Sequence, residues 1–223
     1  MDELTLRLLN RILRLPGRAL LVALAGGVAV GWLSSSGNLP ERTVQLSLLA
    51  AWVAVARASA ERVGPFMAVV LSAGLARRAW FVAHLAAAAL FAAGACFAVL
   101  STHGLRAAFG AALVALVYGW VVGTIGLFAV LRSRRPGETV WIGGILLALI
   151  LASASLLETE AYGAGHAWHP LYLFQYGIRR ALALSSISAY ASGFRIEGII
   201  PPLILSFIAW RWALRSVERL EIV

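Results

Sequence analysis

The stretch Trp80–Leu100, WFVAHLAAAALFAAGACFAVL, contains no Asp, Glu, Lys or Arg. It is long enough for an α-helix to cross the roughly 30 Å of hydrocarbon in a bilayer. His84, near its beginning, is an unusual polar residue for such a run, and we expect it to hydrogen-bond within a helix bundle rather than to relay protons. The stretch therefore predicts a transmembrane helix.

Similar apolar runs recur along the chain and predict five further spans, at residues 19–33, 43–60, 107–131, 140–157 and 198–214. Composition agrees, since 61% of the 223 residues are hydrophobic and 13% are charged, whereas soluble domains have about 25% charged residues. We see no cleavable signal peptide, because the first apolar run begins only after Arg18. The predicted fold class is all-α: a polytopic membrane protein with six transmembrane helices in a single domain, residues 1–223.

The charge of the chain is strongly basic, with a formal net charge of +9, and all 19 basic residues are Arg. These arginines cluster at the ends of the predicted spans instead of forming a surface stripe, which argues against nucleic acid as a partner. The single cysteine, Cys96, excludes disulfides within the chain and cysteine-based metal sites, and is expected to be a packing residue.

The distribution of arginine predicts the orientation. With six spans, both termini lie on one side of the membrane together with most of the arginines, and the exceptions are Arg42, Arg106, Arg179, Arg180 and Arg195. Because cytoplasmic loops are enriched in Arg and Lys, the Arg-rich side is predicted to be cytoplasmic. We therefore expect a multi-pass protein of the cell inner (cytoplasmic) membrane with both termini in the cytoplasm.

The N-terminal segment, residues 1–17, has the pattern of an amphipathic helix that lies on the membrane. Its predicted apolar face contains Leu4, Leu8, Ile12 and Leu15, and its basic face contains Arg7, Arg11 and Arg14. Such a helix places its arginines at the level of the lipid phosphates, so membrane lipid is its expected partner. Pro16 and Gly17 end it.

A second segment, residues 64–78, is too apolar for an ordinary cytoplasmic loop. Gly64 and Pro65 interrupt the preceding helix, and an apolar stretch then leads to the pair Arg77-Arg78. We expect a short helix that docks into a cytoplasmic partner, with its contact residues being Val70, Leu71, Ser72, Leu75, Arg77 and Arg78. The alternative is a simple connecting loop with a snorkelling Arg pair.

The external segment, residues 158–197, contains the apolar run 181–194, which is too short to cross the bilayer. A seventh span would also place the C-terminal arginines outside. We therefore predict a re-entrant helical hairpin that closes the external end of the bundle. Pro170 is suited to a first helical turn, aromatic rings favour the interface, and the predicted gate consists of His169, Pro170, Tyr172, Phe174, Tyr176 and Arg179.

Four motifs, taken in order, resemble the permeases of the type-2 ABC transporter superfamily, whose membrane domains are ABCG-like. LRLLNRILRLPG at 6–17 resembles the connecting helix, and VLSAGLARRAW at 70–80 resembles the loop that holds the coupling helix. GWVVGTIGLFAVLRSRRP at 119–136 resembles the fourth span with its basic turn, and HPLYLFQYGIRRAL at 169–182 resembles the external segment before the last span. His169 replaces the usual Asn, and Ala73 replaces a Pro.

The resemblance implies a permease subunit that pairs with a second copy or a related chain and is driven by a separate cytoplasmic ABC ATP-binding subunit. ATP and Mg would bind to that partner, and no cofactor is expected on this chain. The sequence has no G-x-x-x-x-G-K-[ST] phosphate loop. We therefore expect a transporter subunit, not an enzyme.

Other functions remain open at this point. Glu158, Glu160, His166 and His169 could bind a metal, although a hydrated loop is favoured because Pro and Gly interrupt the segment. A haem-exporter or cytochrome-maturation permease would use His166 and His169 to face haem. An intramembrane hydrolase would need His84 with Ser153, Ser155 or Ser206, and a structural subunit would need none of these.

The expected substrate is hydrophobic or amphipathic and exported, because the spans are rich in Gly, Ala and aromatic residues. Several aromatic side chains could face either the translocation path or lipid: Trp32, Trp52, Phe91, Phe97, Phe109, Trp120 and Phe128.

Overall fold

The computed structural model describes residues 3–14, 39–63, 74–102, 104–161 and 200–218, and every regular element within them is a helix. The helices are α1 (Glu3–Arg14), α3 (Leu39–Val63), α5 (Gly74–Leu100), α6 (Leu105–Arg132), α7 (Pro136–Ala161) and α9 (Ile200–Glu218). Three helical stretches are long and apolar enough to cross a membrane: Arg42–Val63, Arg77–Leu100 and Ala108–Arg132. The all-α class and the membrane character of the chain are thus confirmed.

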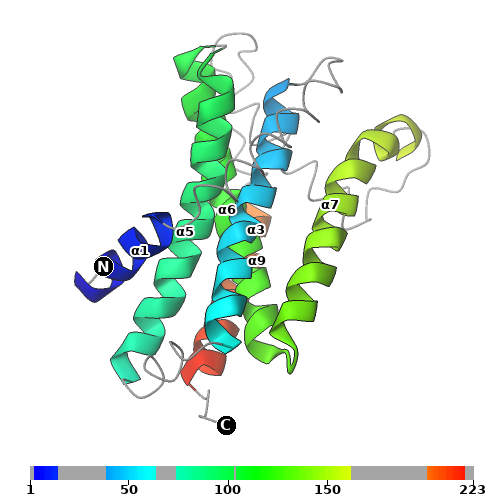
Figure 1. The fold of residues 1–223 in the computed structure, drawn as a ribbon. Helices are drawn as coiled ribbons and strands as arrows, with labels where there is room; N and C mark the ends of the chain where they lie inside the picture. The colour runs from blue at the N-terminus through cyan, green and yellow to red at the C-terminus, as the bar shows by residue number, and fades with distance from the viewer. Residues whose placement is uncertain (1–2, 15–38, 64–73, 103, 162–199, 219–223) are drawn as a thin grey trace.

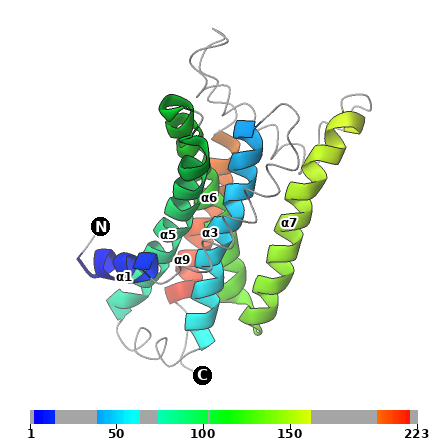
Figure 2. The same ribbon diagram turned by 45° about the horizontal axis from the view of Figure 1, so that its top comes forward.

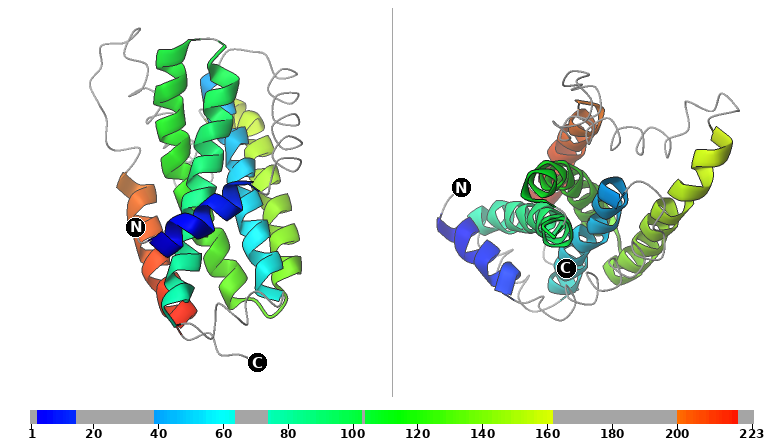
Figure 3. Two further views of the ribbon diagram at one scale, coloured as in Figure 1. Left: turned by 60° about the vertical axis from the view of Figure 1, so that its left-hand side comes forward. Right: turned by 90° about the horizontal axis from the view of Figure 1, so that it is seen from above.

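Helices α3, α5, α6, α7 and α9 run alternately in opposite directions (Figure 1). Helix α3 contacts α5 and α6, which also contact each other, and α9 packs on α6 and α5. Helix α7 stands at the edge of this bundle against α3 and α6, as Figure 2 shows. Helix α1 runs crosswise to the others on the outside of α5, away from α7 (Figure 3).

Small residues allow α5 and α6 to approach each other closely. A Cβ atom added at Gly119 would lie 2.7 Å from the Cβ of Ala92, and one added at Gly123 would lie 2.7 Å from the Cβ of Ala88. Glycine four residues from glycine, facing alanine four residues from alanine, is the pattern by which membrane helices pack without large side chains between them. The backbones of α5 and α6, the two longest described helices, therefore lie close together.

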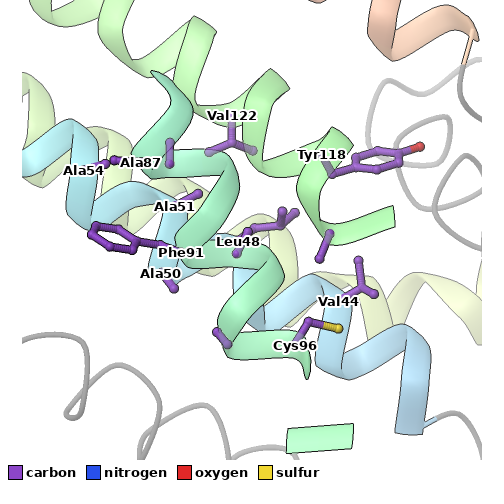
Figure 4. Packing of buried hydrophobic residues seen from close by; sticks show 14 of the residues in the cluster. Val44, Leu48, Ala50, Ala51, Ala54, Ala87, Phe91, Cys96, Tyr118 and Val122 are labelled. Carbon is purple, nitrogen blue, oxygen red and sulfur yellow. The ribbon is translucent and has the colours of Figure 1, made fainter. Parts of the chain in front are cut away.

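Around this contact lies an apolar core from α1, α3, α5 and α6. Leu48 and Val44 of α3 pack with Phe91 and Cys96 of α5, and Tyr118 contributes from α6 (Figure 4). Cys96 is fully buried and free. Its predicted role as a packing residue is confirmed.

Trp52 joins α7 to this core. Its ring lies 2.5–3.0 Å from the positions that Cβ atoms would take at Gly126, Gly143 and Gly144, and its Nε1 donates a hydrogen bond to the carbonyl of Val140 at 3.1 Å. The glycines of α6 and α7 leave the room that the indole occupies. Trp52 and the buried Phe91 thus pack inside the bundle.

The predicted spans correspond to helices from the second onward, since the runs at 43–60, 80–100, 107–131, 140–157 and 198–214 become α3, α5, α6, α7 and α9. Each described helix except α9 extends a few residues beyond its apolar run at the N-terminal end, and residues 158–161 continue α7. The predicted first span, 19–33, and the predicted re-entrant run, 181–194, lie outside the described residues. The six-span count and the hairpin therefore stay predictions.

The buried face of α1 differs from the predicted one by about one residue. Thr5, Leu9 and Ile12 are buried and Leu8 is half-buried against the core, whereas Leu4, expected on the same face as Leu8 and Ile12, is 43% exposed. Arg7 and Arg11 are exposed, as predicted. Leu9 and Ile12 both pack in the core, whereas Leu4 does not. The side of the helix that faces the core is therefore centred nearer to Leu9 than predicted.

Candidate functional site

One end of the bundle collects most of the described arginines. Helices α3, α6 and α9 end there and α5 and α7 begin there (Figure 1). We call it the Arg-rich end; its arginines are Arg57, Arg62, Arg77, Arg78, Arg132, Arg134, Arg135, Arg211 and Arg215. Arg42 and Arg106 lie at the starts of α3 and α6, at the opposite end. The arginines of α3, α5, α6, α7 and α9 are thus separated between the two ends, whereas Arg7, Arg11 and Arg14 belong to α1, which crosses the outside of α5 part-way along it (Figure 1). The orientation in the membrane stays a prediction.

Glu61, in the last turn of α3, is buried at this end, with 8% of it exposed. Its Oε1 accepts a hydrogen bond from Arg57 Nε at 2.9 Å, and its Oε2 accepts one from Trp80 Nε1 at 2.9 Å. The Nε2 of His84 lies 3.3 Å from the same Oε2. Arg57, Glu61, Trp80 and His84 form what we call the Glu61 cluster, which connects α3 to α5.

His84 is 1% exposed and lies within this cluster. Its Nδ1 is 3.0 Å from the carbonyl oxygen of Trp80, and the two rings are in contact at a tilt of 46°, with their centroids 4.6 Å apart. Since a carbonyl oxygen only accepts, this contact is a hydrogen bond when Nδ1 carries the hydrogen of the ring. The expectation that His84 hydrogen-bonds within the bundle is confirmed.

Arg62, the next residue along α3, reaches α6 instead. Its Nη1 donates to the carbonyl of Val130 and to that of Ser133, the latter at 2.8 Å. The last carbonyls of a helix lack partners within the helix and carry partial negative charge, so a guanidinium stabilises them. Arg62 therefore connects the end of α3 to the end of α6.

Beyond α6, the turn into α7 is held by its own hydrogen bonds. Ser133 Oγ accepts from the backbone N–H of Arg135 at 3.0 Å and from Thr139 Oγ1 at 2.6 Å. Arg135 and Glu138 form an exposed ion pair at 2.9 Å. The end of α3, the start of α5 and the α6–α7 turn are thus one connected unit.

The predicted partner-contact residues fall partly within the structure. Arg77 and Arg78 lie in the first turns of α5, the former half-buried and the latter exposed, and each has a polar partner. Leu75 also belongs to α5, whereas Val70, Leu71 and Ser72 lie outside the described residues. The predicted gate, His169, Pro170, Tyr172, Phe174, Tyr176 and Arg179, and the candidate metal ligand His166 lie outside them too. Both sites stay predictions.

Two further candidates can be placed. Ser206 of α9 is buried, and its hydroxyl lies 3.3 Å from Thr124 Oγ1 of α6, while His84 faces Trp80 and Glu61. Ser206 and His84 therefore take separate partners. In the part of the chain that the structure describes, no group of three His, Cys, Asp or Glu side chains gathers to hold a metal ion.

Glu61, the centre of the Glu61 cluster, is the candidate residue that sequence reasoning missed. Charges are common at the ends of spans, so an acidic residue between Arg57 and Arg62 gave no reason to expect burial. The available signal was its spacing from Arg57, which is the i, i+4 pairing of a helix, together with a Trp and a His four residues apart at the start of the next helix.

Comparison of the chain with models of protein families, with curated proteins and with solved structures finds no match to any of them.

Proposed function

We propose that this chain is the membrane-spanning permease subunit of an ABC exporter. A second copy or a related chain completes the translocation path, and a separate cytoplasmic subunit hydrolyses ATP. The substrate is hydrophobic or amphipathic. The proposal rests on the sequence resemblance and on the connections at the Arg-rich end.

The observation that most supports it is the way these connections surround residues 64–73. That segment joins Val63, the last residue of α3, to Gly74, the first residue of α5. The Glu61 cluster connects these two helices, and Arg62 connects α3 to the end of α6. A force that a partner exerts on the segment would therefore act on three helices together, which is what coupling ATP hydrolysis to transport requires.

The described exposed residues agree with an apolar substrate or an apolar neighbour. Large hydrophobic side chains are more than 50% exposed on α6, α7 and α9, including Leu113, Trp141, Ile142, Leu205 and Phe207. Side chains of this kind belong in a bilayer or against another apolar surface. In a permease subunit, such side chains would face the lipid of the bilayer or the apolar surface of a second subunit.

The experiment is purification of the full chain in mild detergent from the membranes that naturally contain it, with identification of co-purifying proteins that carry a phosphate loop. We expect one ATP-binding subunit, whose ATPase activity depends on this chain. Leu71→Asp should reduce its recovery at least tenfold, because a charge placed in a desolvated contact costs several kcal/mol.

The matched control is Leu105→Asp, which places the same charge on an exposed leucine at the opposite end of the bundle. It should leave recovery unchanged. If Leu71→Asp assembles and couples normally, residues 64–78 are not the contact. If the wild-type chain purifies without any ATP-binding protein, the proposed function is wrong.

A further inference from the structure

The Glu61 cluster contains a contact between His84 and Glu61 that is favourable only when a proton lies between the two side chains. Both ring nitrogens of His84 face acceptors, since Nδ1 lies 3.0 Å from the Trp80 carbonyl oxygen and Nε2 lies 3.3 Å from Glu61 Oε2. A neutral ring carries one hydrogen, so one of these two contacts would bring two lone pairs together. Two acceptors at that distance repel each other, and both side chains are buried. The contact becomes attractive when one proton lies between them.

We propose that Glu61 and His84 together bind one proton, and that this proton holds α3 to α5 at the Arg-rich end. The proton resides on His84, as an imidazolium facing a carboxylate. Glu61 already accepts hydrogen bonds from Arg57 and Trp80, and three donors around one carboxylate favour its charged form. This inference does not depend on the transport proposal.

The charges around the pair are consistent with this assignment. On α3, Arg57 faces the carboxylate, and Arg62 is directed to the carbonyls of α6. On α5, Arg77 lies one turn before Trp80. The hydrophobic cluster around Trp80 includes five buried residues of α6 and α9: Leu127, Val130, Leu131, Ala213 and Val217.

Release of the proton would convert the contact between α3 and α5 from attraction to repulsion. The Trp80–Glu61 hydrogen bond would remain, but one oxygen of the carboxylate would face a lone pair. Because both helices adjoin residues 64–73, the protonation state of this pair controls how firmly the two ends of that segment are held together.

The test is ¹⁵N NMR of the His84 ring in detergent micelles at pH 7.5, where a free imidazole is mostly neutral. The chain has four histidines, so replacement of His103, His166 and His169 by Gln leaves His84 as the only signal. We expect both ring nitrogens to show the shift of an N–H nitrogen. In the same background, Glu61→Gln should change Nε2 to a pyridine-type nitrogen, because the amide of Gln can donate to it.

Glu138→Gln is the matched control, since it removes an exposed carboxylate at the same end of the bundle, and it should leave the His84 spectrum unchanged. A pyridine-type Nε2 in the parent chain would contradict the proposal, and that measurement suffices even if Glu61→Gln does not fold. An N–H shift that persists in folded Glu61→Gln, or that is lost in Glu138→Gln, would also contradict it.

Discussion

Glu61 is the residue whose removal should affect the bundle most. Its carboxylate is the common partner of Arg57, Trp80 and His84. Glu61→Ala would remove the carboxylate that the Trp80 indole N–H and the His84 ring contact in a buried site. Breaking a buried ion pair in this way costs about 3–5 kcal/mol. Unfolding in mixed micelles at increasing SDS should show that loss.

Glu138→Ala serves as the control for this substitution. The pair that Glu138 forms with Arg135 is exposed, with side-chain exposures of 62% and 77%, and exposed pairs contribute about 0–1 kcal/mol. If the two substitutions reduce stability equally, the burial of Glu61 does not increase the contribution of its ion pairs to stability.

For single residues, the sequence predicted where a residue lies along a helix better than it predicted which side chains that residue contacts. His84 was recognised as a polar residue in an apolar run, but its partner lies on another helix and the sequence between them gives no register. Trp52 and Phe91 were left open between the translocation path and lipid, and both pack inside. Which side of a helix is buried depends on the neighbours, which composition alone does not reveal.

The pairing of α5 with α6 depends on glycines at the contact. Gly119→Ala would bring a Cβ to 2.7 Å from Ala92 Cβ and 3.1 Å from the carbonyl oxygen of Ala88, so the helices must separate. Overpacking of this kind costs about 1–3 kcal/mol, measurable by the same SDS titration. Gly94→Ala, where nothing lies within 4 Å of the new Cβ, should be neutral or slightly stabilising.

The double variant Gly119→Ala with Ala92→Gly provides a rescue, because it restores the missing space from the other helix. Recovery of part of the lost stability would locate the effect in this contact. If Gly119→Ala is as stable as Gly94→Ala, close approach of α5 and α6 does not stabilise the bundle.

Helices were the most predictable feature of the chain. Apolar runs of sufficient length predicted α3, α5, α6, α7 and α9 within a few residues, because backbone groups in a bilayer must form their hydrogen bonds internally, as a helix does. The face of α1 was predicted less accurately: leucines occur on both sides of it, so contact with the core, rather than periodicity, selects Leu9 over Leu4.

Considered as a whole, the molecule is a membrane bundle with two unlike ends. One end has the Glu61 cluster, the flanks of residues 64–73 and most of the described arginines, and the other has Arg42 and Arg106. The arginine distribution predicted this asymmetry, since charges avoid the interior of the bilayer. The sequence could not predict that the Arg-rich end is also connected internally, because those hydrogen bonds join helices that are distant along the chain.

The proposed function requires the Arg-rich end to face the cytoplasm, where an ATP-binding partner would lie. The direct test is labelling in intact cells with a membrane-impermeant thiol reagent, using Cys96→Ser chains with one new cysteine at either end of α6. Gly137→Cys lies in the first turn of α7, where a Cβ meets nothing within 4 Å, and Thr102→Cys lies in the exposed turn before α6. We predict labelling of Thr102→Cys from outside and of Gly137→Cys only after the membrane is permeabilised. Labelling of Gly137→Cys in intact cells, with Thr102→Cys protected, would contradict the account.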